Sequence, residues 1–361
     1  MTVAEGRIVS VRDSVRPSRA KVLLALTAMF LLSAILSLAI GPTGVSLESL
    51  PRAFAAAIGY TDDAAALRDR LVLIDLRLPR TLLAAFVGAA LATSGAMMQG
   101  LFRNPLADPG LIGDSSGAAL AAIATIVLGN GIAAPLIAPL GIYALPIAAF
   151  FGGLVTTITL VAISARRGHL AVGTLLLAGI ALGALAGSLG GFLAYASDDR
   201  ELRDLTLWSM GSLSGASWEK VLAVLPFAAA IVLAVPQLMR GLNGFLLGEA
   251  EAMHLGVDIE RTKKLTIATT AAAVGAAVAV AGVIGFVGLV APHLMRLISG
   301  PDHRVVLPGS AILGATLVVV ADIIARMAVQ PAELPIGIVL ALVGAPVFLH
   351  LVLRRNIGGG E

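Results

Sequence analysis

Long apolar runs separated by short polar segments dominate this chain of 361 residues. A helix needs roughly 20 predominantly apolar residues to cross a bilayer, and ten runs approach that length. They cover residues 22–40, 78–101, 111–128, 143–164, 171–195, 221–238, 265–281, 284–298, 305–327 and 334–353. The pattern predicts an all-α polytopic membrane protein with ten transmembrane helices.

The spans form one domain between two tails. Residues 1–21 are a basic tail, residues 22–355 a single ten-helix transmembrane domain, and residues 356–361 a C-terminal tail. The run 22–40 is too long for the apolar region of a signal peptide and lacks an evident cleavage site. We therefore expect it to be retained as the first span, with the N-terminus in the cytoplasm.

The composition supports the membrane class and excludes others. Hydrophobic residues make up 58% of the chain and charged residues 13%, whereas soluble domains carry about 25% charged residues. The 40 glycines fit close helix packing in lipid. Because the chain has no cysteine, disulfides and thiolate metal sites are excluded. Its basic residues lie in short loops between apolar runs, which argues against nucleic acid as a partner.

Charge is distributed unequally between the two sets of loops. Ten spans place both termini on one side, where the loops and the end of the last span hold Arg103, Arg166, Arg167, Arg240, Arg261, Lys263, Lys264, Arg296, Arg304, Arg354 and Arg355. The opposite loops include the acidic segment 198–204 and two loops without charge. Because basic loops tend to stay in the cytoplasm, the asymmetry predicts an N-in, C-in topology.

A weak internal repeat relates the two halves of the chain. At one constant offset, residues 87–90, Ala92, Gly95 and Pro105 recur as residues 274–277, Ala279, Gly282 and Pro292. Spans 2–5 would then correspond to spans 7–10, five spans later, and an odd separation inverts the orientation, as in many transporters. The alternative is chance similarity between helices rich in alanine and glycine.

Several motifs together carry a family resemblance. They are Arg77-Leu78-Pro79-Arg80, Ser94-Gly95 with Gln99, Asn104-Pro105-Leu106-Ala107 with Pro109-Gly110, Gly285-Phe286-Val287-Gly288-Leu289, Pro292-His293, Asp302-His303-Arg304, Leu307-Pro308-Gly309, Ala321-Asp322 with Arg326, Glu333-Leu334-Pro335 with Gly337, and Gly344-Ala345-Pro346. Through them the chain resembles the permease subunits of ATP-driven (ABC) importers of the FecCD type, which carry iron–siderophore complexes, haem or cobalamin.

The resemblance implies a machine with several partners. Two copies of the permease would form a homodimer in the bacterial inner membrane and pass substrate along the dimer axis. Two ATP-binding cassette subunits would bind inside, and a soluble periplasmic binding protein would dock outside. The chain lacks a G-x-x-x-x-G-K-[ST] phosphate loop, so we expect ATP to be hydrolysed on the partner and this chain not to be an enzyme.

The segment Leu207–Leu213, which follows Asp198-Asp199, looks closest to the haem members of this family. The expected substrate is therefore haem in transit, with a ferric siderophore or cobalamin as the alternatives and no permanently bound cofactor. An apolar path that includes Met97 and Met98 would suit a flat porphyrin, although methionines at helical spacing more often pack. We assign no metal ligand, because the five histidines lie near predicted cytoplasmic ends.

Three sets of residues are candidate sites. Arg77, Arg80 and Arg326 lie at the outer ends of spans two and nine, and the resemblance implies that they dock the binding protein through its carboxylates. Snorkelling is the alternative for all three, and an i,i+4 pair with Asp322 is a further one for Arg326.

The cytoplasmic gate is expected at two places. One is the turn that holds Asn104 and Leu106, which Pro105 and Pro109 keep from continuing as a helix. The other is the start of span five at Val172, Gly173 and Thr174, where better-known members carry small hydroxyl residues. Asp114, an acid in an apolar helix, is expected to be an N-terminal helix charge rather than a pathway residue.

The third site is the polar, glycine-broken stretch 247–257, which resembles the family's loop of short helices that inserts into the ATPase. Its candidate coupling residues are Glu249, Glu251, Met253, His254, Leu255 and Gly256. A merely solvated loop is the alternative.

A different class of function stays open at this point. A stand-alone secondary transporter driven by protons would need acidic or histidine relays within its spans. Asp114 and Asp322 are the only acids inside the predicted spans, and both lie near span ends. A non-transporting subunit is the third alternative, and the proline-rich turns at both faces argue mildly against it.

Overall fold

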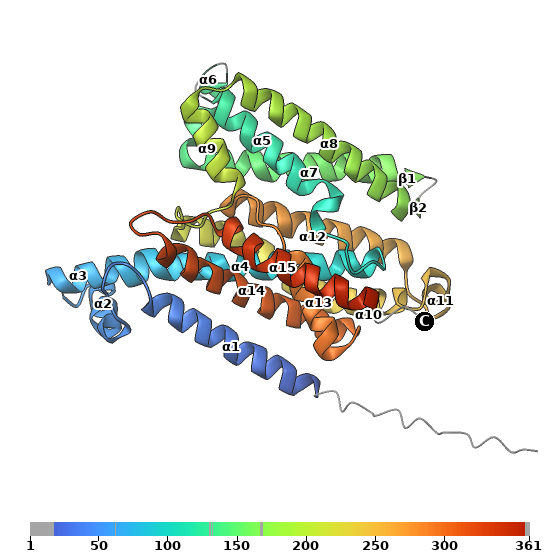
Figure 1. The fold of residues 1–361 in the computed structure, drawn as a ribbon, viewed down its shortest axis with the longest axis horizontal. Helices are drawn as coiled ribbons and strands as arrows, with labels where there is room; N and C mark the ends of the chain where they lie inside the picture. The colour runs from blue at the N-terminus through green and yellow to red at the C-terminus, as the bar shows by residue number, and fades with distance from the viewer. Residues whose placement is uncertain (1–17, 62, 130, 132, 167–168, 358–361) are drawn as a thin grey trace, which may run out of the picture.

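A computed structural model describes residues 18–61, 63–129, 131, 133–166 and 169–357. Ten longer helices follow one another along the chain (Figure 1): α1 (Arg19–Ala39), α4 (Leu78–Leu101), α5 (Asp114–Leu128), α7 (Ala144–Ser164), α8 (Val172–Ala196), α10 (Trp218–Phe245), α12 (Ile259–Ala281), α13 (Val287–Ser299), α14 (His303–Ala328) and α15 (Ile336–Ile357). Each predicted span therefore contains one of these helices, which confirms the all-helical class.

Not all ten helices meet the length expected of a span. Seven helical segments are long and apolar enough to cross a membrane, whereas the apolar parts of α5, α13 and α15 are shorter, namely Ser115–Leu128, Val287–Ser299 and Ile336–Leu349. At 1.5 Å per residue, the 13 residues of α13 extend roughly 20 Å, less than the hydrocarbon core of about 30 Å. The count of ten crossings therefore stays a prediction.

Short elements connect the longer helices, and most of them lie at the two ends of the bundle. They are α2 (Leu50–Ala57), α3 (Ala64–Arg70), α6 (Ala134–Ile137), α9 (Asp199–Ser209), α11 (Glu249–His254), the 3-10 turns Leu47–Ser49, Pro109–Ile112 and Ala138–Tyr143, the π-helical segment Leu71–Arg77, and the hairpin β1 (Ala165–Arg166) with β2 (His169–Leu170). The helices α2, α3, α6 and α9 lie at one end, and α11 and the hairpin at the other (Figure 1). The acidic segment predicted as a loop at 198–204 is thus helical, because Asp198 and Glu201 form a capping box.

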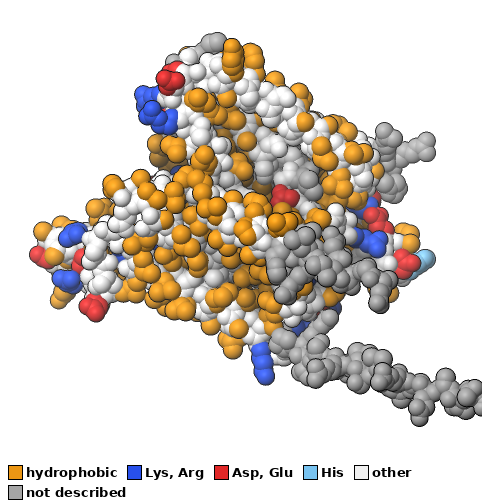
Figure 2. Space-filling view, viewed as in Figure 1, with side chains coloured by type: hydrophobic (Ala, Val, Ile, Leu, Met, Phe, Trp, Pro, Cys, Tyr) orange, Lys and Arg blue, Asp and Glu red, His pale blue; other side chains and the backbone are white. Residues whose placement is uncertain are grey.

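The helix α1 begins, and the helix α15 ends, toward the end of the bundle that carries α11 (Figure 1). The first residue of α1, Arg19, forms an ion pair of 2.7 Å with Asp302 at the start of α14. The helix α15 also runs toward this end (Figure 1). Hydrophobic side chains cover most of the visible middle of the molecule, whereas charged side chains gather mainly toward the ends (Figure 2). This arrangement agrees with termini on one side of the membrane, whereas the orientation in a membrane stays a prediction. The tail at residues 1–21 also stays a prediction, because most of it lies outside the described residues.

The core is built where small residues let helices touch. The helices α4, α12, α13 and α14 enclose the main apolar cluster, and α5, α7 and α8 form a layer beside them (Figure 1). A Cβ added at Gly88 would overlap the carbonyl of Gly314, and one added at Gly95 would overlap the carbonyl of Gly288. Helix association in lipid depends on such close backbone contact. The inverted repeat stays a prediction.

Replacing Gly88 by alanine tests this contact. The added methyl group would force α4 and α14 apart, and overpacking of this kind costs about 1–3 kcal/mol. We expect Gly88→Ala to lower the midpoint of thermal unfolding in detergent. The control is Gly187→Ala in α8, where no atom lies within 4 Å of the added Cβ; higher helix propensity should leave this variant unchanged or up to about 1 kcal/mol more stable. Equal midpoints for the two variants would contradict the packing account.

Candidate functional site

Arg77 fastens α1 to the start of α4. Its guanidinium group donates to the carbonyl of Val45 at 3.0 Å and to Thr43 Oγ1 at 2.9 Å. It also donates to the carbonyls of Leu38 and Ala39 at the end of α1, which have no partner within the helix. The residue is 5% exposed. In this structure Arg77 therefore satisfies backbone carbonyls inside the chain.

Arg80 and Arg326 meet around a buried carboxylate. Asp322 is fully buried, and its oxygens accept from Arg80 Nε at 2.9 Å and lie 3.1 Å from Arg326 Nε. Arg326 also donates to Ser37 Oγ of α1 at 3.0 Å, and Arg80 pairs with Glu333 at 3.0 Å. The i,i+4 pair of Asp322 and Arg326 is thus confirmed. A buried acid needs such partners, because a lone charge in a low-dielectric interior is costly.

The three arginines come together, as their positions at the outer span ends predict, but they do not project freely. The side chain of Arg80 is 12% exposed and that of Arg326 is 5% exposed. Both are already paired with carboxylates of this chain. A carboxylate of a binding protein would therefore have to approach Arg80 beside Glu333, whose side chain is 36% exposed. Docking stays a prediction.

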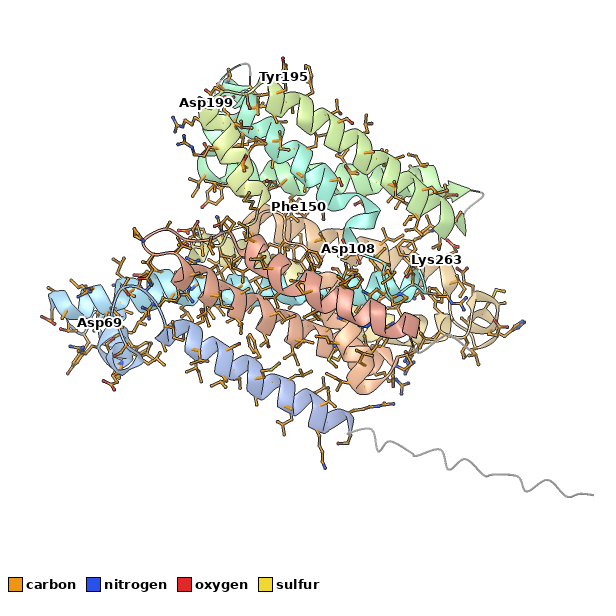
Figure 3. The ribbon with its side chains drawn as sticks, viewed as in Figure 1. Asp69, Asp108, Phe150, Tyr195, Asp199 and Lys263 are labelled. Atoms are coloured by element: carbon orange, nitrogen blue, oxygen red, sulfur yellow. The ribbon has the colours of Figure 1, made fainter. Side chains whose placement is uncertain are left out.

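The turn after α4 has two parts. Asn104 Oδ1 accepts from the Leu106 amide at 2.9 Å. The Leu106 side chain is 50% exposed. Asp108, labelled in Figure 3, then accepts from the Gly110 amide at 2.8 Å and begins the turn Pro109–Ile112. A Cβ at Gly288 would lie 2.9 Å from the Pro109 ring and 3.1 Å from the Leu91 carbonyl. The chain therefore turns back toward the middle of α4 before α5 begins.

The second predicted gate segment lies at the start of α8. Val172 is its first residue, Val172 and Thr174 are half-buried, and Gly173 is exposed with open space around it. The turn Pro109–Ile112 packs against both α4 and α8. The chain that follows Asn104 and Leu106 therefore contacts α8, but a gate formed by both segments stays a prediction. The helix α5 begins at Asp114, as the helix-start interpretation expects, but the Asp114 side chain lies outside the described residues.

The stretch 247–257 folds around the single short helix α11. Gly248 and Gly256 have φ values of 120° and 78°, which favour glycine, and they set α11 apart from α10 and α12. Glu251 and His254 are exposed, and Met253 and Leu255 are 62% and 67% exposed. Exposed apolar side chains in a group are typical of a protein contact.

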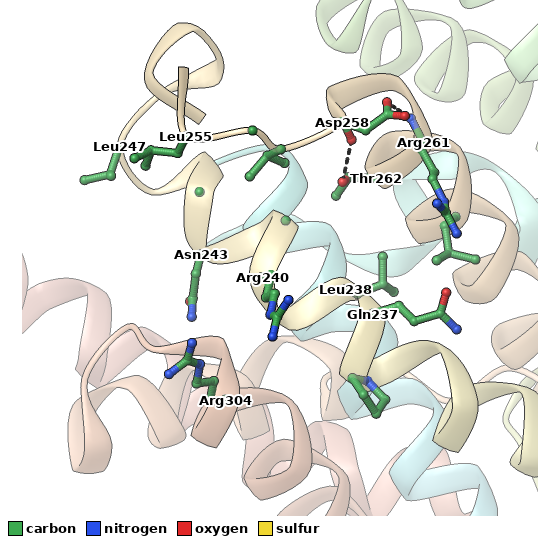
Figure 4. Close-up of a pocket in the computed structure, with 16 residues that line it drawn as sticks. Gln237, Leu238, Arg240, Asn243, Leu247, Leu255, Asp258, Arg261, Thr262 and Arg304 are labelled. Atoms are coloured by element: carbon green, nitrogen blue, oxygen red, sulfur yellow. Dashed lines mark hydrogen bonds between the residues drawn. The ribbon is translucent and has the colours of Figure 1, made fainter. Parts of the chain in front are cut away.

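A cavity of about 850 Å³ lies beside this short helix (Figure 4). Its walls come from α10, α12, α14 and the residues that flank α11, and they include Arg240, Arg261 and Arg304. Leu247 and Leu255 line the same cavity. Near its edge, burial raises the pKa of Asp302, but hydrogen bonds from Arg304 and Asn243 and the charges of Arg19 and Arg304 outweigh this and lower the pKa below its usual value.

The structure differs from the sequence interpretation at the two methionines of α4 and at Arg296. Met97 and Met98 are fully buried in an apolar cluster with Leu101, so they pack and do not line an open path in this structure. Arg296, counted only as a loop charge, donates to Gln99 Oε1 and to the carbonyl of Ala96 in α4. A basic residue in the last turn of a short apolar helix was the available signal for that contact.

Comparison with known proteins identifies the family. The family model described as "FecCD transport family" matches residues 29–354. The chain is 49% identical to the hemin transport system permease protein HmuU of Yersinia pestis, over 78% of this chain and 83% of the relative. It is 42% identical to the vitamin B12 import system permease protein BtuC of Shigella boydii, over 92% and 95%.

A solved structure agrees with these relatives. It is described as an inward-facing conformation of a metal-chelate type ABC transporter and matches with a TM-score of 0.77 and 34% identity, over 93% of this chain and 99% of the other. The family model covers most of the chain, and the fold follows that of the solved transporter. The chain therefore belongs to the FecCD transport family.

Proposed function

We propose that this chain is the membrane permease subunit of an ATP-driven importer and that its substrate is haem. The observation that carries haem is the 49% identity to the Yersinia pestis hemin permease. Cobalamin is the second candidate, because the Shigella boydii B12 permease aligns over 92% of the chain. A ferric siderophore is the third chemistry that the family resemblance implies.

An uncharged helix face supports a path for an apolar ring. The sequence of α8 contains no charged residue over its 25 positions. Leu177, Phe192 and Tyr195 on this helix are 72%, 68% and 90% exposed. Two copies of the chain that meet along α8 would enclose a wide, uncharged passage. We propose a homodimer on this basis, in the bacterial inner membrane and surrounded by lipid.

The two ends of the bundle supply the remaining partners. At the end with α11, the exposed Met253 and Leu255 suit insertion into a cleft of each of two ATP-binding cassette subunits. At the opposite end, the cluster of Arg77, Arg80 and Arg326 suits a periplasmic binding protein that presents carboxylates. ATP would then be hydrolysed by the partner, and this chain would be no enzyme.

The docking proposal predicts that charge reversal in this cluster slows association. Changing Arg77, Arg80 and Arg326 singly to glutamate should weaken binding of the periplasmic protein, mainly through its association rate. Arg80→Glu should have the largest effect on association, because Arg80 is the most exposed of the three. Surface plasmon resonance at low salt measures this, and a thermal unfolding scan identifies any variant that has lost its fold.

Arg52→Glu is the matched control for docking. Arg52 belongs to α2 at the same end, and its side chain is 64% exposed, but it lies outside the cluster. Its association rate should stay near that of the unaltered protein. An unchanged rate for folded Arg80→Glu, or an equal loss for both variants, would exclude docking at this cluster.

The coupling proposal predicts that charges on α11 detach the ATPase. Met253→Asp with Leu255→Asp would place carboxylates where an apolar contact forms, so the ATPase should no longer co-purify, while crosslinking should still detect the permease dimer. Ile142→Asp is the control, because Ile142 is 76% exposed at the opposite end. Normal co-purification and normal stimulation of ATP hydrolysis by the α11 variant would place the contact elsewhere.

The substrate is tested by uptake into proteoliposomes with the ATPase and ATP inside. Haem delivered by its cognate binding protein should accumulate and stimulate ATP hydrolysis, whereas ferric siderophore and cobalamin should not. The control omits ATP. Accumulation of cobalamin or a ferric siderophore without haem would overturn the haem assignment and leave the permease function intact. No ATP-dependent uptake of any of the three would argue against the importer itself.

A further inference from the structure

A buried lysine joins the short helix α11 to the segment before α8. Lys263, in the second turn of α12, is 5% exposed. Its Nζ donates to Glu249 Oε2 of α11 at 2.8 Å and to the carbonyl of Leu170 at 3.2 Å. Glu260 completes the group: its Oε2 accepts from the Leu170 amide at 3.1 Å, and its Oε1 lies 3.9 Å from Lys263 Nζ.

Contacts to both its backbone and its side chain fix the position of Leu170. Its amide and its carbonyl are both bonded to side chains of α12, and it lies two residues before Val172, the first residue of α8. Its side chain is 4% exposed and belongs to the apolar cluster that contains Leu175 of α8 and Ala252 of α11. Polar bonds and apolar packing therefore join the same two segments.

Separating Lys263 from Glu249 and Leu170 is unfavourable in free energy. An ammonium group that loses its carboxylate while it stays buried is strongly destabilised, so Lys263 favours states in which Glu249, Lys263 and Leu170 stay together. A displacement of α11 is therefore passed to the chain before α8. Such a contiguous, fully bonded network is a physical route by which two sites can be coupled.

We propose that Lys263 is a positioning residue that transmits movement of α11 to the cytoplasmic end of α8. This inference rests on the proposed function, in which α11 contacts the ATPase, and on the gate that the sequence predicts at residues 172–174. In that role Lys263 couples ATP binding on the partner to opening or closure of the path, although it touches neither ATP nor substrate.

The adjacent Lys264 provides a matched control. It is exposed and makes no ion pair in the described part of the chain. Lys263→Met and Lys264→Met therefore remove the same charge one residue apart, and only the first breaks the link. Lys263→Arg keeps a charge and donors for Glu249 and Leu170, so it should restore a large part of the coupling.

The first readout is the ratio of substrate transported to ATP hydrolysed in proteoliposomes that contain the complete importer. We expect Lys263→Met to keep its bound ATPase and its basal hydrolysis but to lower the ratio at least tenfold. Lys264→Met should keep the normal ratio. Because Glu249 acts through Lys263, Glu249→Gln combined with Lys263→Met should be no worse than Lys263→Met alone. A normal ratio in Lys263→Met, or an equal loss in Lys264→Met, would overturn the proposal.

The second readout stays informative even if transport is lost for other reasons. The chain has no cysteine, so Ala250→Cys and Gly173→Cys can each carry a single spin label; Ala250 is an exposed residue of α11 outside the proposed ATPase contact, and the space around Gly173 is open. Distances between the two copies in the homodimer are then measured by pulsed electron resonance, with and without ATP and vanadate. In the otherwise unaltered protein both distances should change; with Lys263→Met only the distance at position 250 should change.

The outcomes distinguish a failure of the proposed function from a failure of the role given to Lys263. No change at position 250 without further substitution would refute the contact between α11 and the ATPase, and the inference would fail with it. Changes at both positions that persist in Lys263→Met would refute the role of Lys263 and leave the proposed function standing. A thermal unfolding scan of Lys263→Met confirms that the comparison is made on folded protein.

Discussion

The close approach of α4 and α14 is the constraint on which the rest of the bundle depends. Gly88 and Gly314 touch through their backbones in the middle of both helices. Arg80 lies eight residues before Gly88, and Asp322 lies eight residues after Gly314, so the antiparallel pair brings these charges together roughly 12 Å from the crossing. The ion pairs at this end of the two helices can form because the glycines allow the contact. Arg326 then binds Ser37 and attaches α1 to the same pair.

Irregular backbone inside the bundle follows the same logic. The turn Pro109–Ile112 lies against Leu91 and Gly288 rather than beyond the end of α4. Non-helical backbone is tolerated at membrane depth only where protein surrounds it or water reaches it. Here α4, α8 and the start of α13 surround the turn, and Asp108 satisfies the Gly110 amide. The same arrangement brings the turn after α4 against α8.

Much of the fold and part of the site could be predicted from the sequence, because they depend on local composition. Apolar runs specify helices by length alone, so the existence and order of the ten longer helices followed from the sequence. The glycine-broken stretch 247–257 resembles the family's loop of short helices, and the structure has the one short helix α11 there. Motifs distributed from residue 77 to residue 346 specified the family. Short helices such as α9 were missed because capping, not apolar periodicity, creates them.

Only the tertiary structure decided which charges meet. Arg77, Arg80 and Arg326 were expected to face a partner, but each finds its acceptor inside this chain, at carbonyls around residue 40 or at Asp322. Lys263 and Lys264 are indistinguishable as loop charges, yet one is buried against Glu249 and the other is exposed. Hydropathy is a property of single positions, whereas pairing of charges depends on contacts between residues far apart in sequence. The sequence by itself therefore determined the helices and the family, and packing selected the charge pairs between residues far apart in the sequence.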